Sequence, residues 1–129
     1  MVENNAKTIL VVEDNPGNME LAADLLDIRG FRVLQAATAE EGICLAKAER
    51  PSLILMDIGL PGMNGLQATR LLKKDRQTAS IPVVALTAQA MDDDKEKTLA
   101  AGCVGYITKP IDTRTFVQTI TLFLSAQRS

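Results

Sequence analysis

The residues with the clearest chemical potential stand at the ends of short apolar runs. Carboxylates follow the runs at 8–12 and 52–56, a threonine closes the run at 82–87, and a lysine follows the run at 104–108. These residues are Glu13, Asp14, Asp57, Thr87 and Lys109. A carboxylate can act as a covalent nucleophile toward phosphorus, whereas an amine and a hydroxyl can hold phosphoryl oxygens. The set predicts phosphoryl transfer onto Asp57, provided that the fold brings the residues together.

Three neighbouring carboxylates repel one another, so such a cluster requires a cation unless it takes up protons. The 129-residue chain contains no histidine, which excludes histidine-based triads and histidine metal sites. Its two cysteines, Cys44 and Cys103, each stand alone in an apolar segment, where we expect small buried side chains rather than metal ligands. Oxygen ligands favour Mg²⁺, which binds a few carboxylates together with a phosphate. The residues therefore predict Mg²⁺ as the cofactor.

Each of these residues also has an ordinary structural explanation. Glu13 and Asp14 could simply open the helix that follows them, and Asp57 could form a turn. Thr87 could be a strand threonine, and Lys109 a surface lysine. The chemical interpretation is favoured because separate strand ends supply one coherent set.

The elements that must position these residues alternate regularly along the chain. Apolar, β-branched runs predict strands at 8–12, 31–35, 52–56, 82–87 and 104–108. Segments of helical periodicity lie at 15–30, 38–50, 64–74 and 92–102, and from 112 onward. Such alternation predicts an α/β fold, a doubly wound parallel sheet with helices on both faces. The carboxyl ends of parallel strands share one edge, where open α/β folds bind ligands.

Capping signals support the helix boundaries. Asn15 suits an N-cap and Pro16 the first helical position, while Gly30 suits the end of the same helix. Thr38 and Glu41 have the spacing of a capping box. The charged run at 92–97 is interpreted as a solvated helix face.

Composition limits the other functions that the chain can have. Its 14 basic and 16 acidic residues are interspersed and give a net charge of −2, so we expect no direct nucleic-acid binding. The N-terminal segment has no basic stretch leading into an apolar one, and no apolar run approaches the ~20 residues of a membrane span. We therefore expect a cytoplasmic protein without a membrane segment. Residues 1–129 are expected to form one domain with a core at about 7–125.

The sequence resembles the receiver domains of two-component response regulators. The matching segments are ILVVEDN, LILMDIGLPGMNG, VVALTA and GYITKP, and they occur in the order and spacing of that family over nearly the whole chain. The segments EDNPGNM and LTAQAM are most similar to single-domain receivers of the DivK type and to receivers of hybrid kinases. The resemblance implies the strand order 2-1-3-4-5, which the residues alone do not reveal.

The resemblance also implies a role for each site residue. Asp57 is then the phosphoacceptor and a metal ligand, with Asp14 and the backbone carbonyl of Gly59 as further Mg²⁺ ligands. Glu13 reaches the ion largely through water, and Lys109 contacts the phosphoryl group. Because the chain lacks histidine, the phosphoryl donor must be a partner histidine kinase or histidine phosphotransferase.

A conformational switch is the second implication of the resemblance. Thr87 moves toward the phosphoryl group, Tyr106 turns inward, and the surface of the fourth helix, fifth strand and fifth helix changes partners. The Lys109–Pro110 peptide bond is expected to be cis. Gln89 and Gly59 are candidates for tuning water access, with an ordinary loop role as the alternative.

Four other functional interpretations are weighed against this one. A phosphatase that uses an aspartyl phosphate would have a D-x-D pair, but Asp57 is followed by Ile58 and Gly59. A flavin module would have a phosphate-binding loop where this chain has EDNPGN, whose carboxylates repel phosphate. A phosphorylation-independent scaffold, or a receiver excised from a hybrid kinase, are the remaining alternatives. The expected protein catalyses only its own phosphorylation and dephosphorylation.

Overall fold

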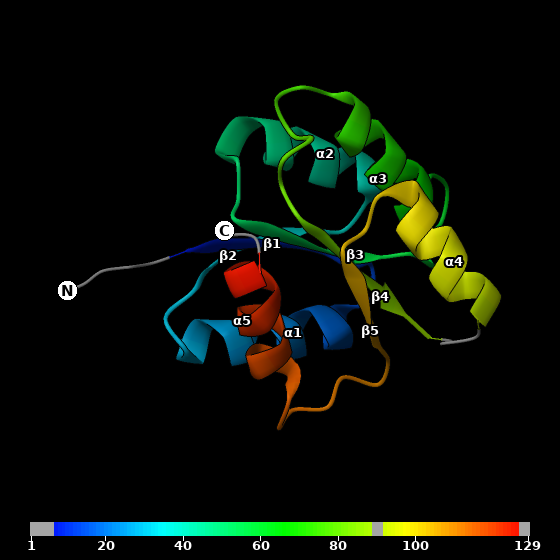
Figure 1. Ribbon diagram of the computed structural model, residues 1–129. Coiled ribbons are helices and arrows are strands. Elements are labelled where there is room, and N and C mark those ends of the chain that lie inside the picture. The colour runs from blue at the N-terminus through cyan, green and yellow to red at the C-terminus, as the bar shows by residue number, and fades with distance from the viewer. Residues whose placement is uncertain (1–6, 89–91, 127–129) are drawn as a thin grey trace.

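The computed structural model describes residues 7–88 and 92–126, which form alternating strands and helices (Figure 1). Gln89, a candidate for tuning water access, lies outside the described residues. The elements are β1 (Thr8–Val12), α1 (Pro16–Ile28), β2 (Arg32–Ala36), α2 (Ala39–Glu49), β3 (Leu53–Asp57), α3 (Gly65–Lys74), β4 (Val83–Thr87), α4 (Asp92–Ala101), β5 (Gly105–Thr108) and α5 (Phe116–Ala126).

The strands form one parallel sheet in the order β2-β1-β3-β4-β5. Ile9 of β1 pairs with Leu53 of β3, and Asp57 of β3 pairs with Leu86 of β4. β3 is thus central, and its residues are all buried. The predicted fold class and strand order are confirmed.

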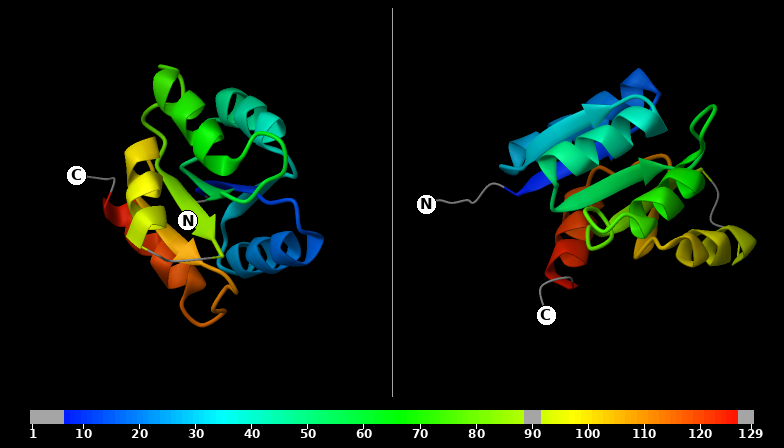
Figure 2. Two further views of the ribbon diagram at one scale, coloured as in Figure 1. Left: turned by 90° about the vertical axis from the view of Figure 1, so that its right-hand side faces the viewer. Right: turned by 90° about the horizontal axis from the view of Figure 1, so that it is seen from above.

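Helices cover both faces of this sheet, as Figures 1 and 2 show. α1 and α5 pack on one face, whereas α2 and α3 pack on the other, with α4 beside α3. Neighbouring strand residues point to opposite faces, so Ile9 and Leu53 join one core and Leu10 and Ile54 join the other. The strands β1, β3 and β4 are therefore buried on both sides, which explains why their sequences are apolar at consecutive positions.

Most predicted boundaries agree with the structure, but the fifth helix begins later than expected. The prediction started it at Asp112, whereas α5 begins at Phe116. The carboxylate of Asp112 accepts a hydrogen bond from the Arg114 backbone N–H at 2.9 Å, and its carbonyl accepts one from Phe116. Asp112 therefore closes a turn that precedes the helix.

The two cysteines differ in exposure, contrary to the prediction. Cys103 is buried, but Cys44 is exposed. The inward face of α2 is formed by Ala39, Gly42 and Ala46, and Cys44 lies two residues, about 200°, beyond Gly42. No helix among the described residues is long and apolar enough to cross a membrane.

Candidate functional site

Three carboxylates meet where the order of the sheet reverses. After β1 the chain turns to β2 on one side, and the next strand, β3, pairs with β1 on the other side. Glu13 and Asp14 follow β1, and Asp57 ends β3. Carboxylate oxygens of these three residues lie within 4.8 Å of one another. The cluster thus occupies the switch point at which open α/β sheets bind ligands.

Asp57 is held from two directions at the bottom of this site. Its side chain is buried. Oδ1 accepts a hydrogen bond from the Gly59 backbone N–H at 2.8 Å, and Oδ2 lies 3.0 Å from Nζ of Lys109. The turn interpretation of Asp57 is therefore confirmed, and it is compatible with the chemical one because the turn fixes the orientation of the carboxylate.

Lys109, which follows β5, links the ends of β4 and β5 to the carboxylate cluster. Its backbone N–H donates to the carbonyl of Thr87 at 2.8 Å, which joins the ends of β4 and β5. Its ammonium lies between Asp57 and Glu13, 3.3 Å from Oε1 of the latter. Thr87 is buried and lines the same pocket. The bond between Lys109 and Pro110 is cis.

Glu13 belongs to the site as predicted, but it is buried more deeply than a residue that only opens a helix would be. It is 2% exposed, so it does not act as a solvated helix-opening residue. Oε2 accepts a hydrogen bond from the Asn15 backbone N–H at 3.0 Å. Oε1 accepts no hydrogen bond from the described residues, since its contact with Lys109 is an ion pair without hydrogen-bond alignment. A buried carboxylate oxygen is thus left for another ligand.

The electrostatics of the cluster favour an additional cation. Burial raises the pKa of Glu13, and the neighbouring Asp57 carboxylate raises it further, against the lowering effects of Asn15 and Lys109. Burial lowers the pKa of Lys109, but the contacts with Asp57 and Glu13 outweigh burial and raise it overall. One ammonium therefore faces three carboxylates. This donor set, with the unbonded Oε1, fits a hard divalent cation.

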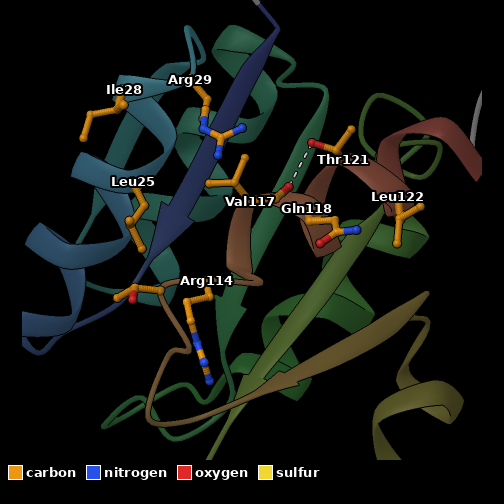
Figure 3. A pocket seen from close by; sticks show the side chains of 9 residues that line it. Leu25, Ile28, Arg29, Arg114, Val117, Gln118, Thr121 and Leu122 are labelled. Carbon is orange, nitrogen blue, oxygen red and sulfur yellow. Dashed lines mark hydrogen bonds between the residues drawn. The ribbon is translucent and has the colours of Figure 1, made fainter.

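The cluster lines an open pocket of about 570 Å³, which also includes Asn15, Asn18 and Ile58. A second pocket of similar size, about 550 Å³, lies between α1 and α5 (Figure 3). Its apolar part is formed by Leu25, Ile28, Val117 and Leu122, and its lining residues include no carboxylate. The acidic cluster therefore lies in the pocket at the strand ends.

Gly65 supports Asp57 from behind, a role that sequence reasoning missed. A Cβ atom at this position would overlap the carbonyl oxygen of Asp57 and lie 2.7 Å from Cα of Ile58. The first turn of α3 therefore packs directly on the backbone of the phosphoacceptor candidate. The sequence did contain a sign of this contact. Gly65 immediately follows the N-cap Asn64, and glycine is unfavourable in a helix, so its presence there indicates a close approach of another part of the backbone.

Lys95 was also misread from the sequence. It was assigned to a solvated face, but its side chain is half-buried and its Nζ lies 5.6 Å from the centroid of the Tyr106 ring. Tyr106 lies on β5 and is itself half-buried. The partial burial of Lys95 follows from its spacing along the helix. Lys95 precedes the buried Thr98 by three residues and therefore lies on the same helix face.

Comparison with known proteins defines the class. The family model of the response regulator receiver domain matches residues 9–121. The chain belongs to this family of two-component signal transduction proteins, which are not conventional enzymes. Receiver membership implies a histidine kinase as the phosphoryl donor, and the acidic cluster is typical of receivers that bind Mg²⁺.

Several individual proteins are similar to this chain over nearly their whole length. Polar-differentiation response regulator DivK from Brucella anthropi is 43% identical over 118 residues, which cover 92% of this chain and 96% of that protein. DivK from Brucella ovis is 42% identical over the same shares. The receiver domain of a sensor histidine kinase from Pseudomonas aeruginosa, described with a magnesium ion coordinated in its active-site cleft, is 32% identical, with a TM-score of 0.85 and coverage of 93% and 98%. A CheY-like receiver from Methanospirillum hungatei is 31% identical, with a TM-score of 0.87 and coverage of 95% and 97%.

Proposed function

We propose that the chain is a stand-alone, single-domain receiver that accepts a phosphoryl group on Asp57 in a Mg²⁺-dependent reaction. The observation that carries the proposal is the convergence of three carboxylates and Lys109 around the buried Asp57. The DivK relatives support the stand-alone form, since the match covers 96% of their length. The proposal includes a cytoplasmic location and excludes direct binding to nucleic acid.

The phosphoryl donor is a phosphohistidine of a histidine kinase or a histidine phosphotransferase. A carboxylate oxygen of Asp57 attacks phosphorus, and the bond between phosphorus and the donor imidazole breaks. The electron pair of that bond stays on the imidazole nitrogen, which takes a proton from solvent, and Asp57 becomes an acyl phosphate. Later attack by water returns the carboxylate and releases inorganic phosphate.

The protein contributes mainly position and charge to this transfer. The hydrogen bond from Gly59 orients Asp57, and Lys109, 3.0 Å from Oδ2, is placed to contact phosphoryl oxygens. Asp14, Asp57 and the carbonyl of Gly59 would hold Mg²⁺, with Glu13 acting largely through water. The ion supplies positive charge for the carboxylates and the phosphoryl oxygens.

Phosphorylation changes the surface to which a downstream protein binds. The hydroxyl of Thr87, at the end of β4, donates a hydrogen bond to the new phosphoryl oxygens, and Tyr106 of β5 turns inward as Thr87 moves. A downstream protein then binds the face formed by α4, β5 and α5. A shift from 1:99 to 99:1 requires ~5.5 kcal/mol of differential stabilisation, so phosphorylation either activates the protein in part or acts together with partner binding.

Intact mass spectrometry tests the phosphoacceptor directly. Wild type and Asp57→Asn are incubated with acetyl phosphate, with Mg²⁺ or with a chelator. We expect a phosphoryl adduct only on wild type and only with Mg²⁺, while circular dichroism shows both proteins folded. An adduct on Asp57→Asn would refute the assignment. If neither acetyl phosphate nor beryllofluoride modifies wild type, and Asp57→Asn has no phenotype, the phosphorylation-independent scaffold replaces the receiver switch.

A further inference from the structure

Lys95 occupies an inward position of α4 that an amphipathic helix would normally give to an apolar residue. Thr98 and Ala101 are buried and follow Lys95 by three and six residues, whereas Glu96 and Lys97 between them are exposed. Among the described side chains of α4, Lys95 is therefore the one that covers the sheet ahead of Thr98. Its four-carbon stem can lie on apolar surface while the ammonium reaches a partner.

The contact that Lys95 makes there is with the ring of Tyr106. An Nζ-to-centroid distance of 5.6 Å lies within the roughly 6 Å range of a cation–π interaction. Tyr106 also packs against the core that lies under α2 and α3. The ring is thus held between apolar side chains of the core and a cation from the neighbouring helix.

We propose that Lys95 is a positioning residue that stabilises the described position of Tyr106 and thereby sets the population of the switch. This inference rests on the proposed function, in which Tyr106 turns inward after phosphorylation. Under this proposal the inward turn carries the ring away from the Lys95 ammonium, which lies 5.6 Å from its centroid in the described position, so the contact opposes the switch. A partly exposed cation–π contact corresponds to a bias of about two- to fivefold in a two-state equilibrium.

The chain contains its own reporter for this contact. Tyr106 is the only tyrosine and the sequence contains no tryptophan. The tyrosine band in near-ultraviolet circular dichroism and the intrinsic fluorescence therefore report on this one ring. Occupancy of the site by beryllofluoride can be followed separately by fluorine NMR.

The test compares Lys95→Gln with Lys95→Arg and with the matched control Lys97→Gln. Each protein is titrated with beryllofluoride in the presence of Mg²⁺ while the Tyr106 signal is recorded. We expect Lys95→Gln to change the Tyr106 signal of the protein before titration and to lower the beryllofluoride concentration at half-change by about two- to fivefold. Lys95→Arg, which keeps the cation, and Lys97→Gln, on the exposed face, should both behave as wild type.

Two kinds of result would overturn the inference. An unchanged Tyr106 signal and an unchanged midpoint in Lys95→Gln would show that the contact does not position the ring, and an equal shift in Lys97→Gln would show only a general charge effect. If beryllofluoride binds wild type without any change at Tyr106, the switch and the Lys95 inference fail together. That outcome leaves phosphorylation of Asp57 intact, because mass spectrometry measures it independently.

Discussion

At the scale of single residues, the site is defined by an excess of buried negative charge. Glu13 is almost fully buried, and its Oε1 has no hydrogen bond from the described residues. Lys109 is shared between this carboxylate and Asp57. The arrangement is suited to binding a cation, and for the same reason it is destabilising when no cation is bound.

Glu13→Gln is therefore expected to stabilise the chelator-treated protein at neutral pH. The folded-state pKa of Glu13 is raised above the ordinary value of 4.5, mainly by burial. The ionised side chain thus destabilises the fold at pH above the raised pKa, and this effect vanishes below 4.5, where both states are protonated. An unsatisfied buried polar group costs about 1–3 kcal/mol, so we expect a midpoint several degrees higher at neutral pH and little gain below pH 4.5.

Thermal unfolding at the two pH values checks this expectation, with Glu20→Gln on the exposed face of α1 as the control. A lower midpoint for Glu13→Gln at neutral pH would show that Glu13 stabilises the metal-free fold.

The convergence of the site residues could be predicted because strand ends share one edge of a parallel sheet. The burial of Glu13 and the exposure of Cys44 could not, since both depend on how helices pack beside them. The contact between Lys95 and Tyr106 joins two elements and likewise required the structure.

At the scale of elements, the position of Asp57 depends on the close approach of α3. Because Gly65 has no Cβ atom, the helix can begin directly against the carbonyl oxygen of Asp57. Asn64 and Gln67 hold this start in a reciprocal capping box, with both hydrogen bonds at 3.0 Å. The helix start and Asp57 are thus one packed unit.

Gly65→Ala should destabilise the protein by about 1–3 kcal/mol, the typical cost of overpacking, and slow phosphorylation of Asp57. The added methyl group meets backbone atoms, which cannot move without displacing β3. Gly59→Ala is the matched control, because its methyl group would lie 3.5 Å from Oδ1 of Asp57, an ordinary contact distance. Chemical denaturation and the acetyl phosphate mass assay measure the two effects. Equal stability of the two variants would refute the role of Gly65.

The elements themselves were largely predictable. β1 has the predicted bounds, and β2 and β3 are displaced by one residue. For β1 and β3 the signal is the continuous apolar run of a strand that is buried on both faces. The late start of α5 was not predictable from the capping signal at Asp112, because an aspartate that closes a turn and one that caps a helix look alike in sequence.

At the scale of the whole molecule, alternation of strands and helices predicted the sheet but not its strand order. The residues are compatible with several parallel arrangements, and the order 2-1-3-4-5 followed only from the family resemblance. That order decides which strand ends are neighbours and hence which residues share the site. Lys73 joins helix α3 to the segment that leads into β4, because its Nζ donates to the carbonyls of Ile81 and Ala79 at 2.6 and 3.1 Å.

Lys73→Met is expected to lower the free energy of unfolding by about 1–2 kcal/mol, since it removes two charge-assisted hydrogen bonds of a half-buried group. The exposed neighbour in Lys74→Met serves as the control. Urea denaturation with an unchanged m value measures the difference, and phosphorylation of Asp57 should persist in both variants. A loss in Lys74→Met as large as that in Lys73→Met would show that charge alone matters.

The hydrogen bonds of Lys73 have a mechanical consequence. They hold the segment that leads into β4, while Thr87 stands at the carboxyl end of the strand. All five residues of β4 are buried, so the strand is held at its amino end and packed along its whole length. We therefore expect Thr87 to respond to phosphorylation by a local movement at the end of β4 and not by sliding of the whole strand.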